Sequence, residues 1–181
     1  MKNKTMVVWL CLASVIVLGI FVYLGVMYFL YPIKYKDEIK KYSSEYRIES
    51  ELVASLINAE SGFDENAISS KGAIGLMQIM PSTAEWVASL IGVEYKDEYL
   101  KNPDYNIMIG CYYLKYLKNK FDDRIVILCA YNAGEGVVSS WLNDTNYSYD
   151  GKTLDNIPYK STNVYVKKIL SSIDIYRKKL K

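Results

Sequence analysis

The segment Leu52–Glu60 has the sequence LVASLINAE. Its apolar residues repeat at helical spacing, as they do along most of the chain, and the segment ends in an acidic residue, Glu60. Glu60 lies seven positions after Val53 and three after Ile57, and residues at these spacings share one side of an α-helix. That side is the apolar one. The pattern therefore predicts a helix that directs the carboxyl group of Glu60 toward the core or toward a cleft in it.

The position of Glu60 determines the chemistry that it can perform. An ionised carboxylate is costly to remove from water, so burial beside apolar residues raises the pKa of the group. A carboxylic acid that stays protonated near neutral pH is what the cleavage of a glycosidic bond requires of its general acid. The alternative is that Glu60 ends its helix at the surface as a solvated acid, and spacing alone leaves both interpretations open.

Helical spacing continues through nearly all of the remaining sequence, and no window alternates with period two. Ser82–Glu85 has the form of a capping box that opens a helix, and Ile125–Tyr131 is apolar enough to be buried on all sides. Gly134 and Gly136 are expected to break the chain after this buried helix. The predicted fold class is all-α, with helices packed around a central buried one. Further helices are expected near residues 107–121, 137–142 and 162–180, and a polar loop is expected at residues 143–159.

The N-terminal segment has no charged residue between Thr5 and Ile33 and is nearly all apolar from Met6 to Leu30. About 20 apolar residues are enough to cross the hydrocarbon core of a membrane. No small-x-small cleavage site follows the run, so we predict an uncleaved signal anchor with one transmembrane helix in residues 1–31. The expected organisation continues with a juxtamembrane linker in residues 32–42 and one folded domain in residues 43–181.

The composition excludes several classes of protein. The chain has 181 residues and no His, which rules out a Ser-His-Asp triad, a Cys-His dyad and a His-ligated zinc site. A net charge of +2, from 22 basic and 20 acidic residues, gives no large field toward nucleic acid. Cys11, Cys111 and Cys129 lack metal-ligand spacing. The last two are interpreted as buried thiols, and a disulfide between them is left open. We expect no metal and no cofactor.

Several short elements follow one another around and after the acid. In chain order they are Ala59-Glu60-Ser61-Gly62-Phe63, Gly75-Leu76-Met77-Gln78, Ala130-Tyr131-Asn132-Ala133-Gly134, Ile157-Pro158-Tyr159 and Tyr165-Val166. In their order and spacing these elements resemble the catalytic domain of the soluble lytic transglycosylases, over roughly residues 43–178. The resemblance implies a lysozyme-like fold and an enzyme that cuts the glycan strands of bacterial peptidoglycan.

The resemblance also implies a role for individual residues. Glu60 would be the catalytic residue, first as general acid and then as general base. Gln78 would line the cleft and hydrogen-bond sugar, and Met80 would pack on the glycan. Ser69 would contact the peptide stem or an acetamido group.

The other expected substrate-binding residues lie in the later sequence elements, except for Ser61, which directly follows Glu60. Tyr131 would direct its hydroxyl group toward Glu60 and the reacting sugar, and Asn132 would hold that corner in place. Ser61 and Tyr165 complete the expected set. The chain departs from the family where a Glu-Thr-Arg sequence is common, because it has Ser161-Thr162-Asn163 there.

The implied reaction cleaves the bond between N-acetylmuramic acid and N-acetylglucosamine and closes a 1,6-anhydro ring without consuming water. Two alternatives stay open. One is a muramidase that uses water and a second carboxylate, taken from Asp64, Glu65, Glu85 or Glu135. The other is a non-catalytic glycan-binding or assembly protein. The expected partners are peptidoglycan strands and, through the N-terminal helix, the bacterial cell membrane, with the domain outside the cytoplasm. No nucleic acid is expected, and the sequence does not indicate an oligomeric state.

Overall fold

The structure is a computed structural model that describes residues 2–181, with the backbone alone at residues 2–5, 7, 8 and 11. It divides into two compact units, one that ends at Pro32 and one that covers Ile33–Lys181. Within the described residues there is no β-strand, and only isolated bridges join Ile74 to Ile68 and Ile79. The predicted all-α class is confirmed. The helices are α1 (Lys2–Leu30), α2 (Lys36–Tyr46), α3 (Ser50–Glu60), α4 (Pro81–Ile91), the 3-10 helix η1 (Asp97–Lys101), α5 (Pro103–Lys120), α6 (Arg124–Ala133), α7 (Glu135–Leu142) and α8 (Lys160–Lys179).

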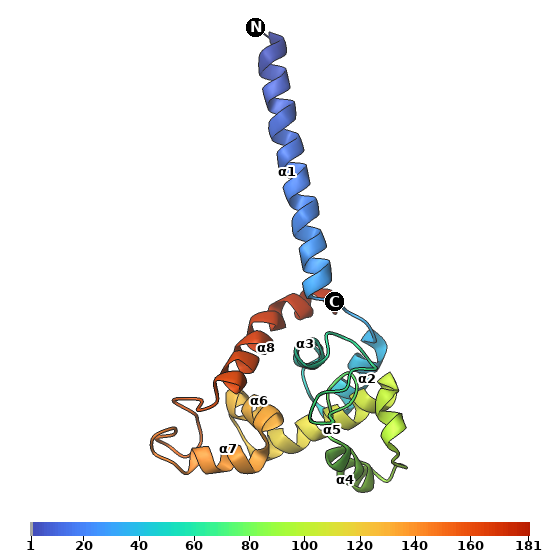
Figure 1. Cartoon of the computed structure of the whole chain (residues 1–181), viewed down its shortest axis with the longest axis vertical. Helices are drawn as coiled ribbons and strands as arrows, with labels where there is room; N and C mark the ends of the chain where they lie inside the picture. The colour runs from blue at the N-terminus through green and yellow to red at the C-terminus, as the bar shows by residue number, and fades with distance from the viewer. Residues whose placement is uncertain (1) are drawn as a thin grey trace. The chain divides into compact units, whose positions relative to one another are not determined.

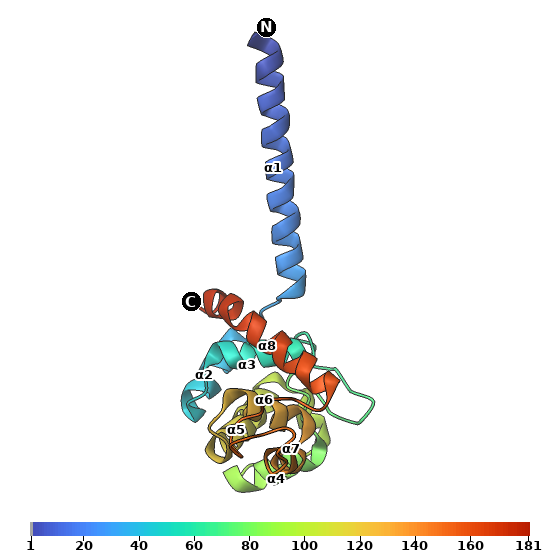
Figure 2. The ribbon, with the colours of Figure 1, turned by 90° about the vertical axis from the view of Figure 1, so that its left-hand side faces the viewer.

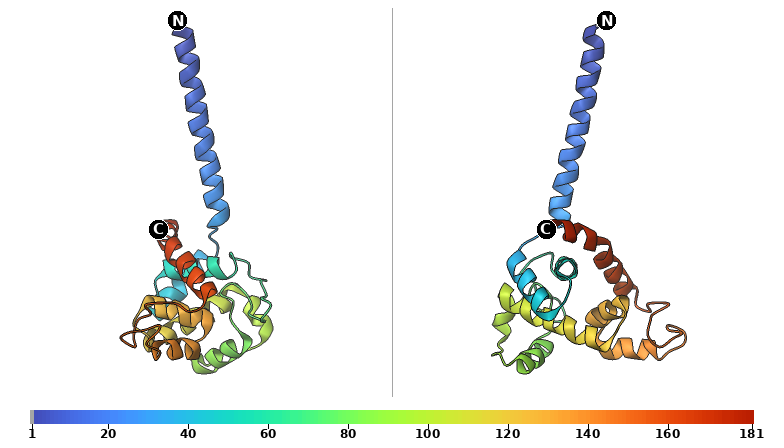
Figure 3. Two further views of the ribbon diagram at one scale, coloured as in Figure 1. Left: turned by 60° about the vertical axis from the view of Figure 1, so that its left-hand side comes forward. Right: turned by 180° about the vertical axis from the view of Figure 1, so that it is seen from behind.

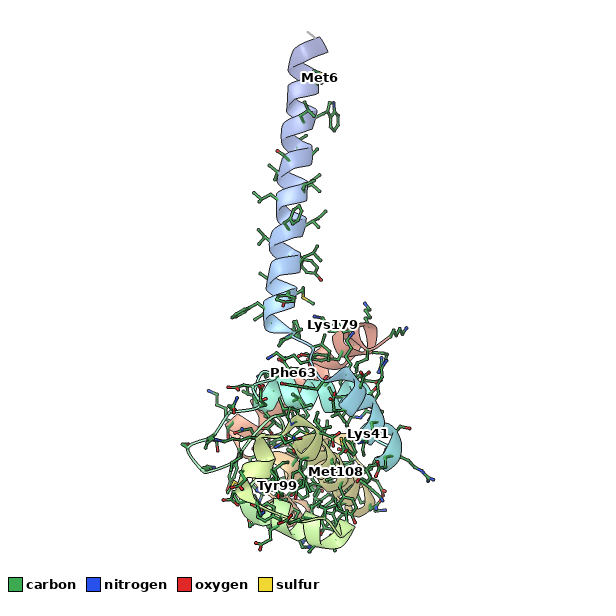
Figure 4. The ribbon with its side chains drawn as sticks, turned by 90° about the vertical axis from the view of Figure 1, so that its right-hand side faces the viewer. Met6, Lys41, Phe63, Tyr99, Met108 and Lys179 are labelled. Carbon is green, nitrogen blue, oxygen red and sulfur yellow. The ribbon has the colours of Figure 1, made fainter. Side chains whose placement is uncertain are left out.

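The first unit is the single helix α1. Its stretch Leu12–Leu30 has 19 residues and is long and apolar enough to cross a membrane, and no part of that stretch is buried within the protein. Figure 4 shows side chains standing off this helix along its length, with Met6 labelled near its start. Large apolar side chains such as Trp9 and Phe29 are exposed. A helix that is apolar all round requires an apolar surrounding of its own.

Helix α3 packs mainly on α8 and also on α2 within the second unit. Figure 1 shows α3 nearly end-on, and Figure 2 shows α8 running beside it. Val53, Leu56 and Ile57 are fully buried, as the spacing along LVASLINAE predicts. Glu60 lies on the same side of α3, but it is the last residue of the helix and is therefore only partly buried, at the edge of the core.

Helix α6 is the predicted central helix, and it contacts α5, α7 and α8. Val126, Leu128, Cys129 and Ala130 have no exposed surface, so its apolar sequence is explained by burial on every side. The carboxylate of Asp123 caps the helix by accepting a hydrogen bond of 2.9 Å from the backbone N–H of Val126.

Two details of the helix ends differ from the prediction. Helix α4 begins at Pro81, and its N-cap residue, Met80, makes no side-chain capping hydrogen bond. The prediction that Ser82–Glu85 forms a capping box that opens this helix is therefore wrong. Proline favours the first position of a helix because it has no N–H to leave unpaired, and this preference moves the start ahead of Ser82. Gly134 does end helix α6, with φ at 92°, whereas Gly136 lies inside α7.

The second unit also begins earlier than residue 43. Most of the segment expected as a linker, residues 32–42, forms α2, and its Ile39 and Tyr42 are buried against the rest of the unit. Both Cys111 and Cys129 are buried free thiols. The polar loop of residues 143–159 joins α7 to α8, as Figure 3 shows.

Candidate active site

Two adjoining cavities, of about 320 and 220 Å³, are both lined by the same five residues. We call their union the groove. The five shared residues are Lys71, Gln78, Met80, Tyr131 and Asn132. Glu60 and Ser69 line only the smaller cavity, and Thr83 and Tyr113 line only the larger one. The groove thus brings together residues from α3, the turns after it, α4, α5 and α6.

Glu60 is the last residue of α3 and is mostly shielded from water. Burial raises the pKa of its carboxyl group to about 7, although a hydrogen bond from Tyr165 and the charge of Lys168 act in the opposite direction. The Tyr165 hydroxyl donates to Glu60 Oε1 at 2.7 Å. Among the described residues, none donates a hydrogen bond to the other oxygen, Oε2. One oxygen of the carboxyl group is therefore held by α8, and the other is available to a ligand in the groove.

Lys168 supports the same end of α3 from α8. Its Nζ donates to the backbone carbonyl oxygens of Ala59 at 3.1 Å and of Asn58 at 3.4 Å. Carbonyl groups in the last turn of a helix lack partners within the helix and carry partial negative charge, which a nearby cation stabilises. Lys168 and Tyr165 thus fix the helix end that carries Glu60.

Tyr131 lies near Glu60, but the hydrogen bond of its hydroxyl group goes elsewhere. It lines the groove, but its hydroxyl group donates to the backbone carbonyl of Met77 at 2.9 Å, while the hydroxyl that reaches Glu60 belongs to Tyr165. Burial, together with the nearby charge of Glu60, raises the pKa of the Tyr131 phenol well above 10. Burial raises the pKa of the Tyr165 phenol well above 10 in the same way, so both tyrosines stay protonated and act as hydrogen-bond donors at neutral pH.

The turns of residues 67–80 shape the part of the groove that faces a ligand. Gln78 has φ at 50°, and its Nε2 donates to the carbonyl oxygens of Gly75 at 2.9 Å and Ala67 at 3.1 Å. Because these bonds use its amide hydrogens, the amide oxygen of Gln78 is left to accept a hydrogen bond from a ligand.

A buried asparagine, Asn106 on α5, ties these turns to the helical core. Its Nδ2 donates to Leu100 O at 2.8 Å and Ile74 O at 3.0 Å, and its Oδ1 accepts from Met77 N at 2.8 Å. Asn106 was not among the site residues predicted from the sequence. The available signal was an Asn beside Ile107, at the start of an amphipathic helix, where a polar side chain must satisfy its hydrogen bonds internally.

The remaining predicted site residues are placed as follows. Ser69 and Met80 line the groove, and 40% of Met80 is exposed. Asn132 also lines it, and its Oδ1 accepts a hydrogen bond of 2.9 Å from Thr162 on α8. Ser61 does not line it, because its hydroxyl group donates to Leu76 O at 2.8 Å and joins α3 to the turns. Lys71, Thr83 and Tyr113 line the groove without having been predicted.

None of the four acids considered as a second carboxylate lines the groove. Two of them are held elsewhere, since Glu65 accepts from the Tyr35 hydroxyl at 2.9 Å and Glu135 pairs with Lys120. Among the residues that the structure describes, no group of three or more His, Cys, Asp or Glu side chains could hold a metal ion. The groove therefore contains a single carboxyl group, that of Glu60.

The geometry agrees with a comparison against protein families. A family model described as the transglycosylase SLT domain matches residues 37–153. This chain belongs to that family. The resemblance found in the sequence is thereby confirmed. Among curated relatives, the soluble lytic murein transglycosylase of Escherichia coli (strain K12) is 35% identical over 151 residues, which are 81% of this chain and 23% of the relative.

Other relatives and solved structures support the same placement. The membrane-bound lytic murein transglycosylase C of Haemophilus ducreyi is 35% identical over 116 residues, which are 58% of this chain and 32% of the relative. An inactive mutant of the lytic transglycosylase Slt from Pseudomonas aeruginosa superposes with a TM-score of 0.76 at 30% identity, over 85% of this chain and 25% of that one. The 70 kDa soluble lytic transglycosylase of Escherichia coli gives 0.72 at 32% identity, over 81% and 24%. The SLT domain chain thus spans about a quarter to a third of the length of these relatives.

Proposed function

We propose that this SLT domain protein is a peptidoglycan lytic transglycosylase with Glu60 as its one acid/base residue. The main support for this proposal is that Glu60 has the only carboxyl group lining the groove and that burial raises its pKa to about 7. The names of the relatives support murein, that is peptidoglycan, as the substrate. A hydrolase that needs two carboxylates, about 5 to 9.5 Å apart, finds no second one in this groove.

The first step is cleavage of the bond between N-acetylmuramic acid and N-acetylglucosamine. Protonated Glu60 donates its proton to the glycosidic oxygen, the bond from that oxygen to C1 of the muramic acid breaks, and the N-acetylglucosamine leaves with its 4-hydroxyl group restored. The acetamido oxygen of the muramic acid bonds to C1 and takes up the developing positive charge. The hydrogen bond from Tyr165 to Oε1 keeps the carboxyl group oriented while the proton leaves from Oε2.

The second step closes the 1,6-anhydro ring. The Glu60 carboxylate takes the proton of the C6 hydroxyl group, whose oxygen attacks C1 and displaces the acetamido oxygen. Glu60 is then protonated again, and no water is consumed. A carboxyl group with a pKa near the working pH suits both halves of this cycle, because it must give a proton and then take one.

The deciding experiment is mass spectrometry of the products released from purified peptidoglycan by the full chain in detergent. We expect anhydro-muropeptides from the wild type and none from Glu60→Gln. Glu65→Gln is the matched control, because it makes the same change at an acid outside the groove and should leave the products unaltered. Products one water heavier would establish a muramidase, and tight glycan binding without any product would establish a binding protein.

We further propose that α1 anchors the protein in the cell membrane as a single span, with the SLT domain outside the cytoplasm. The proposal is supported by the length and apolar character of Leu12–Leu30 and by a relative described as membrane-bound. The proposed organisation is an anchor in residues 1–31 followed by the catalytic domain. Membrane fractionation tests it, since the full chain should sediment with membranes and a chain lacking residues 1–31 should not. Recovery of the full chain in the soluble fraction would contradict the anchor.

A further inference from the structure

Lys71 stands at a fixed turn on the groove. The backbone N–H of Gly72 donates to Ser69 O at 2.9 Å, which closes a four-residue turn with Lys71 at its third position. The Ser69 hydroxyl group accepts from Ala73 N at 2.9 Å, and Ser69 N donates to Ala73 O at 2.9 Å. Gly72 has φ at 85°, a conformation that favours glycine. The turn therefore presents the Lys71 side chain from a backbone that is held by three hydrogen bonds.

Lys71 is the only cation among the residues that line the groove, and it lines both cavities. The side chain is exposed, and no described residue forms a salt bridge or hydrogen bond with its ammonium group. Its charge also does not serve Glu60, because the cation that acts on that carboxyl group is Lys168. A positive charge in the substrate groove is thus left without a partner in the protein.

The proposed substrate carries its negative charges in one place. The rings of N-acetylglucosamine and N-acetylmuramic acid are neutral, and only the lactyl arm on C3 of the muramic acid bears carboxylates. In an intact strand these belong to the peptide stem attached to the arm, and in a strand without stems the carboxylate is that of the arm itself. An unpaired ammonium group in the groove is complementary to either source.

We infer that Lys71 binds a carboxylate carried on the lactyl arm of N-acetylmuramic acid and so selects strands by the charge of that arm. This inference rests on the proposed function and goes beyond it, since it assigns a specificity-determining residue. The ion pair forms at an exposed position, so its effect on affinity is modest. It acts on binding of the substrate and not on the proton transfers at Glu60.

The test compares Lys71→Gln with the wild type on three forms of the same peptidoglycan: strands with stems, strands from which an amidase has removed the stems, and strands whose carboxylates have been converted to neutral methylamides. We expect the substitution to raise KM about fivefold on a charged form, to leave kcat nearly unchanged, and to have no effect on the methylamide form. An effect on strands with stems identifies a stem carboxylate, and an effect on strands without stems identifies the lactyl carboxylate.

Two further variants sharpen the result. Lys71→Arg should retain the wild-type KM because it keeps the charge, and Lys101→Gln should do so because Lys101 is exposed and does not line the groove. An equal rise in KM on all three forms would mean that Lys71 binds sugar, and no rise on either charged form would mean that it binds no carboxylate. Both results overturn the inference. Failure of the proposed function is distinguishable, because the wild type itself would then release no anhydro products.

Discussion

The two sides of the groove are built in different ways. Glu60 is carried by α3 and held by α8, so regular helices determine where its carboxyl group lies. The other side, residues 67–80, has no regular element, and its form depends on left-handed backbone at Gly72, Gly75 and Gln78. The first side places one reactive atom, whereas the second forms the surface on which a sugar strand would lie.

Substitutions on the two sides of the groove should therefore have different effects. A change at Glu60 or Tyr165 alters chemistry on a scaffold that packing has already determined. A change at a left-handed residue of the segment 67–80, or at Asn106, alters the scaffold itself, because left-handed backbone and hydrogen bonds to Asn106 replace helical packing there.

Glu60→Gln should lower kcat by roughly a thousandfold or more while glycan affinity changes little, because the amide has the same shape but cannot donate the proton. The loss is measured by the rate of release of anhydro products under saturating peptidoglycan. Affinity is measured by co-sedimentation with the insoluble wall. Retention of more than a tenth of the wild-type rate would remove Glu60 from the mechanism.

Gly75→Ala should destabilise the fold by about 3 kcal/mol, measured by chemical denaturation. Gly75 has φ at 80°, and a Cβ atom added there would overlap the carbonyl oxygen of Leu100 and the amide of Asn106. Gly92→Ala is the matched control, since Gly92 also has a left-handed φ, at 72°, but an added Cβ meets nothing within 4 Å. The control should lose only about 1 kcal/mol. Equal losses at the two sites would mean that the backbone conformation alone, and not the approach of Asn106, shapes these turns.

The helical side of the groove was open to prediction from the sequence, and the turn side was not. The spacing of Val53, Ile57 and Glu60 determines a face of α3, because helix geometry is the same wherever a helix forms. The partners of that face come from more than 100 positions later in the chain, at Tyr165 and Lys168, and spacing carries no information about such contacts.

The resemblance to a known family supplied part of what spacing could not. It marked Gln78, Met80 and Asn132, which all line the groove, and it also marked Ser61, which does not. It placed both Tyr131 and Tyr165 at the site, but which of the two hydroxyl groups donates to Glu60 is seen only in their three-dimensional positions. Lys71 was missed, since an exposed lysine in a turn has no sequence signature of its own.

Glu60→Gln should also make the fold more stable at pH 8 than the wild type, by up to roughly 3 kcal/mol, and should make little difference at pH 4. The pKa of Glu60 is raised from 4.5 to about 7 in the folded chain, so folding favours the protonated acid. Its contribution to stability is complete below about pH 4.5 and is lost as the pH rises to 7, where the buried carboxylate must ionise. Contact with solvent makes the figure an upper bound. Denaturation of both proteins at the two pH values measures the difference, and a gap that does not grow with pH would contradict burial of the acid.

Tyr165→Phe should lower kcat about tenfold and move the alkaline limit of activity to higher pH. The hydroxyl group donates to Glu60 Oε1 and lowers the pKa of the carboxyl group, so its removal leaves the acid protonated to a higher pH but less well oriented. The measurement is kcat/KM as a function of pH. Tyr113→Phe is the matched control, because Tyr113 lines the groove without a hydrogen bond to Glu60 and should shift neither limb. A fall in rate with an unchanged pH profile would show that Tyr165 positions Glu60 without changing its pKa. The helical side of the groove would then act as the turn side does, through its shape and not through the pKa of the acid.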